Sequence, residues 1–311
     1  MMFFRSLKLS ATRVMARCLR YVLPFSLCLT ACGLDLKNGL ARRNQETKSE
    51  FDSIDCGPDA DPLVLDFVSL RKRLTGETPV CSVAMDELAQ SQSNWLLLNA
   101  DLKLSVKPHE QRAGTPGFSG ATLAARMQRQ NLETDQYFIA ETIAQGDFSS
   151  NIWRAHLGSV LHRSILLAPG LTTFGFSQNA AATVLTAAVS VDRKQFAPVF
   201  YPIDSESVGT ARLLSERPAQ DLAAVGMGYP ISVHFPWGCS DLSVLRFKVQ
   251  HAGKDLAGKF FTKRELPNLS ASELYFISTE VLPAGESIDV DAALSCGSQT
   301  FTKVWRFNTI F

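Results

Sequence analysis

Residues 137–144, which read YFIAETIA, form the stretch on which the predicted fold and the predicted site both depend. Apart from Glu141 and Thr142 the stretch is apolar, so it predicts a short strand or extended segment inside the protein. A buried carboxylate is costly unless it is hydrogen-bonded, paired or bound to a metal. Glu141 is therefore expected either in a structural polar network or in a functional site.

Helical patterns surround this stretch. Helices are predicted at 62–74, 82–99 and 120–131, and one or two short helices within 148–167. Ser82 is the candidate N-cap of the second helix. Two strands are expected at 172–177 and 182–191. Helices mixed with a few strands predict an α/β or α+β domain over residues 56–203, and we expect the α+β class.

The character of the chain changes after residue 205. Short apolar runs rich in β-branched residues recur about every ten residues and are separated by Gly and Pro, at 231–235, 244–249, 256–262, 274–278, 288–296 and 301–307. This pattern predicts an antiparallel β-sandwich over residues 204–311. The sequence LPAGE at 282–286 resembles the late-strand corner of immunoglobulin-like modules.

The first 31 residues have the pattern of a secretory signal peptide. Residues 1–20 carry five basic residues and no acidic one, and residues 21–31 are apolar and end in small residues. The alternative, a buried N-terminal helix, would have to bury those five charges and tolerate Pro24. The remaining chain has 26 basic and 30 acidic residues, a net charge of −4, so no nucleic-acid partner is expected.

The residues at the end of this segment predict a lipid anchor. Leu29–Cys32 resembles the bacterial lipobox, which implies cleavage before Cys32 and acylation of its thiol. Gly33 follows instead of Asp, which implies sorting to the outer membrane rather than the inner membrane. Residues 32–55 are polar and charged, so they are expected to form a flexible tether between the lipid and the fold.

Four of the seven cysteines remain after export and lipidation: Cys56, Cys81, Cys239 and Cys296. An even number of cysteines in an exported protein suggests two disulfides, and four cysteines allow three connectivities. Their positions favour Cys56–Cys81 and Cys239–Cys296, since each pair then lies within one predicted domain. Free buried thiols are the alternative, whereas the spacing fits no zinc motif.

The five histidines are not equally strong candidates for site residues. His109 lies in a polar loop, and function concentrates in loops on a rigid scaffold. His234 and His251 lie in expected strands and are assigned packing or surface roles. His156 and His162 are six residues apart, which does not place them on one helix face. The sequence contains no G-x-S-x-G, H-E-x-x-H or P-loop motif.

Residues 62–203 resemble the CAP superfamily (cysteine-rich secretory proteins, antigen 5 and pathogenesis-related proteins), in its bacterial SCP-like branch. The matching segments occur in the family's order, at 65–71 with 78–80, 88–99, 109–110, 116–120 with Arg126, 140–146, Trp153 with 161–167, and 175–176. The chain departs from the family at Thr142, where Asn is usual. Residues 198–311 look like the β-rich module that often follows bacterial CAP domains.

The resemblance implies a CAP-type α-β-α sandwich followed by an all-β immunoglobulin-like sandwich. It also implies a cleft at which His109, Glu141 and His162 converge and bind a divalent cation. Two neutral imidazoles and a carboxylate suit Zn²⁺. The second acid of the family's His/Glu tetrad has no clear match, and Glu110 is the nearest candidate.

The sequence thus predicts an exported, lipid-anchored protein of the bacterial envelope that binds a lipid, glycan or peptide without catalysis. The alternative is a metal-dependent hydrolase or peptidase that uses the same histidines and Glu141. The missing second acid counts against this alternative, because a metal-bound water needs a base. A third interpretation gives both domains a structural role in an envelope assembly.

Overall fold

The computed structural model describes residues 53–102, 108–132, 135–145, 152–192, 196–212, 227–237, 239 and 241–310. By their internal contacts, residues Ser49–Phe311 group as one compact unit. The predicted signal peptide, the predicted lipidation site Cys32 and nearly all of the predicted tether lie outside the described residues. Within the described part of the chain, no helix combines the length and the apolar character needed to cross a bilayer.

The first sheet has the strand order β1-β2-β4-β5-β3. Its strands are β1 (Ser53–Ile54), β2 (Val80–Ser82), β3 (Tyr137–Gln145), β4 (Leu171–Gln178) and β5 (Ala182–Ser190). β5 pairs antiparallel with β3 and β4, whereas β2 and β4 are parallel. All residues of β5 except the last are buried, because small and β-branched side chains fill both of its faces. The strand expected at residues 137–144 is β3, the last strand of this sheet.

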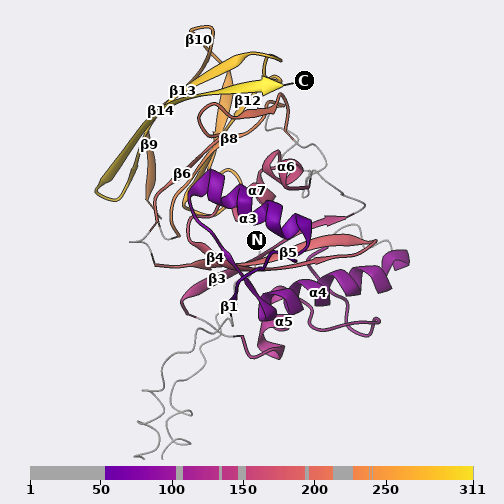
Figure 1. The fold of residues 1–311 in the computed structure, drawn as a ribbon. Coiled ribbons are helices and arrows are strands. Elements are labelled where there is room, and N and C mark those ends of the chain that lie inside the picture. The colour runs from indigo at the N-terminus through magenta and orange to yellow at the C-terminus, as the bar shows by residue number, and fades with distance from the viewer. Residues whose placement is uncertain are drawn as a thin grey trace, which may run out of the picture. The chain divides into compact units, whose positions relative to one another are not determined.

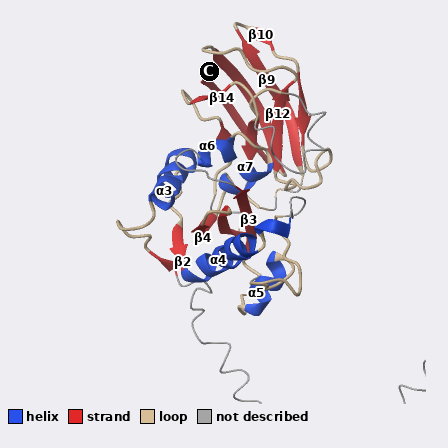
Figure 2. Ribbon diagram, turned by 90° about the vertical axis from the view of Figure 1, so that its right-hand side faces the viewer, coloured by secondary structure: helices blue, strands red, loops and turns tan. Residues whose placement is uncertain are grey.

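Helices cover both faces of the first sheet. They are α3 (Pro62–Thr75), α4 (Val83–Leu98), α5 (Leu123–Arg129), α6 (Ile152–Leu157) and α7 (Leu161–Leu166), with a 3₁₀ turn η3 (Ala100–Leu102) after α4. Figures 1 and 2 show α3, α6 and α7 on one side and α4 and α5 on the other. Ser82 caps α4 as predicted, because its hydroxyl accepts a hydrogen bond from the Met85 backbone N–H. α3 ends at Gly76, whose φ of 78° is the left-handed conformation that favours glycine.

Aromatic side chains fasten the helices to the first sheet. The ring centroid of Phe67 in α3 lies 5.1 Å from that of Trp153 in α6 and 4.8 Å from that of Phe174 in β4. The Trp153 indole also donates a hydrogen bond of 2.9 Å to the Leu63 carbonyl. Phe67 and Phe174 are fully buried, so this trio ties α3, α6 and β4 into one core.

Two further sheets form the C-terminal half. One has the order β11-β12-β8-β6, with β6 (Val199–Tyr201), β8 (Ile231–His234), β11 (Gly258–Phe261) and β12 (Glu273–Ser278). The other has the order β10-β9-β13-β14-β7, with β7 (Ser207–Gly209), β9 (Leu242–His251), β10 (Lys254–Asp255), β13 (Ser287–Cys296) and β14 (Gln299–Ile310). Each of the six strand segments expected after residue 205 coincides with an observed strand.

The predicted fold class, α+β with a CAP-type α-β-α sandwich and an immunoglobulin-like sandwich, is wrong. Of the described residues, 38% lie in strands and 23% in helices, and the strands form three sheets. One predicted helix is shorter than expected, and the strands of the three sheets hold more residues than all the helices together. The expected helix at 120–131 begins only at Leu123, whereas α6 and α7 are the short helices expected within 148–167, separated at Gly158, whose N–H closes the last turn of α6. The β-sheets therefore dominate the core.

The core continues across the predicted domain boundary between residues 203 and 204. β6, which precedes that boundary, pairs antiparallel with β8. Arg163 of α7 is fully buried, donates hydrogen bonds to the Pro230 carbonyl and the Ser232 hydroxyl, and lies over the rings of Tyr201 and Tyr229 at 4.7 and 4.9 Å. The guanidinium thus joins α7 to β6 and the strand β8.

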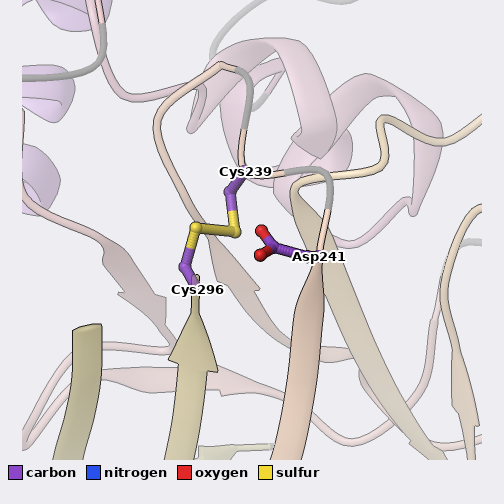
Figure 3. Close-up of side chains that lie close together, drawn as sticks. All are labelled: Cys239, Asp241 and Cys296. Carbon is purple, nitrogen blue, oxygen red and sulfur yellow. A yellow bond between two sulfur atoms is a disulfide. The ribbon is translucent and has the colours of Figure 1, made fainter. Parts of the chain in front are cut away.

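Both predicted disulfides are present. Cys56–Cys81 ties the segment before α3 to β2, and Cys239–Cys296 ties the segment after β8 to the end of β13. The second disulfide is shown in Figure 3. The pairing predicted from the cysteine positions is therefore confirmed. Each pair lies within one half of the chain, as expected.

Candidate functional site

A pocket of about 740 Å³ lies where β3, α7, the end of β8 and the loop before β12 meet. Most of its lining side chains are apolar, and they include Phe138, Ile139, Ala140, Leu161, Ile165, Phe235, Trp237, Pro267, Leu269 and Ala271. Its polar and charged lining residues are fewer and include His109, Glu110, Glu141, Ser164, Lys263 and Glu273. An apolar concavity with a few polar groups is the usual form of a small-molecule binding site.

The loop that carries His109 is fastened to α4. The Gln92 amide donates to the Pro108 carbonyl, and the Gln111 amide donates to Gln92 Oε1 at 3.0 Å. The Gln111 side-chain oxygen accepts from the Ser119 backbone N–H at 2.7 Å. These bonds use buried amides from both segments, so the backbone at His109 is held in place although the His109 side chain is half exposed.

Glu141 is buried and fully paired. Arg126 of α5 donates to Glu141 Oε2 at 2.7 Å, and His109 Nδ1 lies 3.1 Å from Oε1. Arg126 and Glu141 are both buried, and Arg126 also donates to the His109 carbonyl at 3.3 Å. A Cβ at Gly120 would lie 2.8 Å from the Arg126 backbone nitrogen, so glycine permits the close turn that brings Arg126 to Glu141. The expected partner His109 is in place, and sequence reasoning missed Arg126 as a partner.

His162 lies against a histidine that was not expected to join it. The rings of His156 and His162 stack with centroids 4.5 Å apart, because the break at residues 158–160 folds α6 back onto α7. Burial, and secondarily the nearby His109, lowers the pKa of His162 to about 4. Burial and the His162 ring lower the pKa of His156 as well. The missed signal is Gly158-Ser159, which ends a helix between two histidines.

The predicted metal ligands do not fit a metal site. Among the described residues, only one group of three His, Cys, Asp or Glu side chains brings its ligand atoms within 4.8 Å of one another, and it contains none of His109, Glu141 and His162. The Glu141 carboxylate is already held by the Arg126 guanidinium, whose positive charge opposes a cation at the same oxygens. Glu110, the candidate second acid, is exposed and lines the pocket. The arrangement of these side chains therefore gives no support to metal chemistry in the pocket.

The group that does meet this distance criterion is Cys239, Asp241 and Cys296. Figure 3 shows the Asp241 carboxylate beside the disulfide between the two cysteines. A metal binds cysteine as the thiolate, and both sulfurs are consumed in the S–S bond. Only Asp241 retains a ligand atom, so this group does not form a metal site either.

Two aromatic rings from distant parts of the chain meet at the pocket. Phe138 of β3 stacks on Trp237, which follows β8, with ring centroids 4.3 Å apart and planes inclined by 15°. Both side chains line the pocket, and Phe138 is 41% exposed. Sequence reasoning missed this pair, although Trp237 follows a proline and precedes a glycine in the sequence, a context typical of loops.

Ser232, His234 and Glu273 follow the residue order of a hydrolase triad but lack its histidine–acid hydrogen bond and its exposure. His234 Nε2 lies 2.9 Å from Ser232 Oγ, and its Nδ1 lies 4.0 Å from Glu273 Oε1. Ser232 is fully buried, does not line the pocket, and accepts a hydrogen bond from Arg163. A nucleophile must contact its substrate, so Ser232, His234 and Glu273 form a structural network. The packing role expected for His234 agrees with this placement.

Comparison with known proteins adds no identification. No family model matches the chain, and no curated protein matches it. Among solved structures, an outer surface protein from Borrelia burgdorferi is similar over 45% of this chain and 98% of its own, at 18% sequence identity and a TM-score of 0.32. A likeness this low supports no conclusion about fold or function. The resemblance of residues 62–203 to the CAP superfamily therefore stays a prediction.

Proposed function

We propose that this chain is a non-catalytic ligand-binding protein of the bacterial envelope, exported and held at the outer membrane by lipid on Cys32. The observation that carries the binding role is the pocket of about 740 Å³, whose walls are mostly apolar. Pockets of roughly 300–1,000 Å³ with this kind of lining hold small organic ligands. The envelope location rests on the sequence of residues 1–33.

The stacked rings of Phe138 and Trp237 strengthen this assignment. A stacked aromatic pair that stays partly exposed at the mouth of an apolar pocket offers contact area to an apolar ligand. The catalytic alternative is less well supported, because Arg126 occupies the Glu141 carboxylate and Ser232 is inaccessible. The pocket thus has features of recognition without an accessible reacting group.

The test is binding of a neutral apolar dye, N-phenyl-1-naphthylamine, followed by its fluorescence. We expect saturable binding at one site per chain. Ala271→Trp places a large side chain in the pocket lining and should weaken binding by roughly tenfold or more, since it occupies the ligand's volume. Ala257→Trp is the matched control, because Ala257 is exposed and lies outside the lining.

Two results would contradict the proposal. Dye binding that Ala271→Trp leaves unchanged would place the binding site elsewhere on the protein. The absence of saturable dye binding to the folded wild-type chain would remove the ligand-binding role.

A further inference from the structure

We propose that the ligand of this pocket is an organic cation, an ammonium or amidinium group attached to an apolar body, with its charge received by Glu273. The inference deepens the proposed function and rests on it, because it names the ligand class of the same pocket. The evidence for it is a difference between two carboxylates of the pocket: Glu141 is paired with an arginine, whereas Glu273 has no lysine or arginine partner among the described residues.

Glu273 is a buried carboxylate with little to balance its charge. It begins β12, is 5% exposed and lines the pocket. The Ser164 hydroxyl, which has one hydrogen to donate, lies within hydrogen-bond distance of both carboxylate oxygens, at 2.6 and 2.5 Å. Within the described part of the chain, Glu273 forms no ion pair with a lysine or arginine, and His234 Nδ1 at 4.0 Å is beyond hydrogen-bond distance.

His234 does not supply the missing positive charge. Burial lowers its pKa, and this effect outweighs the opposing attraction of Glu273. A lower pKa favours the neutral ring, so the carboxylate faces a neutral imidazole and a hydroxyl. Buried carboxylates in apolar surroundings are stabilised by a positive partner. A cationic ligand in the pocket would be that partner.

The other charged groups of the lining do not reverse this preference. Arg126 already pairs with Glu141. Outside that pair, the lining contains two carboxylates, Glu110 and Glu273, and one ammonium, Lys263. Glu110 and Lys263 are exposed, whereas Glu273 is buried. The unpaired carboxylate of Glu273 therefore lies in the buried part of the pocket, where the dielectric constant is low. A cation is favoured there.

The aromatic pair adds to the attraction. The faces of Phe138 and Trp237 are partly exposed at the pocket, and aromatic faces attract organic cations. The apolar residues around them exclude water from the ligand's body. A protonated amine on a hydrocarbon chain therefore matches both the charge and the apolar lining.

The experiment compares three ligands of equal chain length, octylamine, octan-1-ol and octanoate, by calorimetric titration of the full chain at pH 7.5. Octylamine should bind roughly tenfold or more tightly than octanol, and octanoate should bind least. Glu273→Gln should bring octylamine to the affinity of octanol, because the amide keeps the shape and removes the charge. Glu280→Gln, an exposed change outside the pocket lining, should leave all three affinities unchanged.

The outcomes separate this inference from the proposed function. If octylamine and octanol bind wild-type protein equally, the preference for a cation is overturned while the apolar pocket stands. A preference for octylamine that persists in Glu273→Gln would also overturn the role of Glu273. If none of the three ligands binds and the neutral dye does, only the cation inference falls. If the dye fails as well, both fall. The wild-type comparison alone decides the preference should Glu273→Gln not fold.

Discussion

The two buried carboxylates of the pocket, Glu141 on β3 and Glu273 on β12, are held in different ways. Glu141 is paired with the Arg126 guanidinium at 2.7 Å, whereas Glu273 accepts hydrogen bonds only from the Ser164 hydroxyl among the partners that the described chain provides. Removing the cation from a buried ion pair is strongly destabilising, and a buried carboxylate without a cation lowers stability unless a ligand supplies the charge. The comparison assigns Glu141 to the structure and Glu273 to the ligand.

Removal of the arginine on the Glu141 side should have the largest effect on stability. Arg126→Met leaves a buried carboxylate without its cation, and breaking a buried pair in this way costs ~3–5 kcal/mol. The free energy of unfolding from urea titration measures the loss. Arg129→Met is the matched control, because Arg129 is on the same helix and exposed.

A second substitution decides whether the pair itself is the cause. In Arg126→Met with Glu141→Gln the buried charge is gone, so most of the loss should be recovered. A double variant as unstable as Arg126→Met alone would mean that α5 loses its packing rather than its ion pair. In that case the contrast between Glu141 and Glu273 would lose its physical basis.

The buried imidazole of His162 should make the stability of the protein depend on pH. The folded-state pKa of His162 is about 4, below its ordinary value of 6.5, so the unfolded chain binds the proton more readily. The contribution of His162 to the free energy of unfolding is complete above pH 6.5. It is lost as pH falls toward about 4, by up to about 3 kcal/mol. Urea titrations across this range should show a smaller pH dependence for His162→Gln than for wild type.

The control for this measurement is His251→Gln. His251 lies on β9 at the protein surface and pairs with Glu286 at 3.6 Å. The free energy of unfolding of the His251→Gln variant should depend on pH as that of wild type does between pH 6.5 and 4. If His162→Gln and His251→Gln behave alike, the burial of His162 does not determine the acid sensitivity.

The two halves of the molecule also differ in what their sequences predict. In the C-terminal half, glycines and prolines separate short apolar runs. Each expected strand is observed, because the period of two with which side chains alternate along a strand is a local property of the sequence. In the N-terminal half, α3 and α4 agree closely with the predicted segments. The short helices α6 and α7 lie within 148–167, where one or two short helices were predicted, whereas α5 is shorter than predicted because it begins only after the turn at Gly120. The predicted fold class was wrong because strands in three sheets hold 38% of the described residues.

The site was predictable where burial followed from local sequence. Glu141 was expected inside because apolar residues surround it in the chain, and its proximity to His109 is observed. Arg126 was not expected to be its partner, since that contact depends on the turn at Gly120. Glu273 was missed because its burial results from α7 packing against β12, more than 100 residues away in sequence. Contacts of that separation leave no periodic pattern in either segment.

The smallest effect on stability is expected at Glu273, and it sharpens the comparison most. Glu273→Gln removes a buried charge that no lysine or arginine of the described residues pairs with, while the amide oxygen still accepts a hydrogen bond from Ser164. The free energy of unfolding should therefore stay the same or rise by up to about 1 kcal/mol. Glu141→Gln, by contrast, should lower it, because Arg126 loses its partner. Parallel urea titrations of the two variants without ligand provide the measurement. Equal losses at the two sites would show that Glu273 is as much a part of the fold as Glu141, and the assignment of Glu273 to a ligand would then fail.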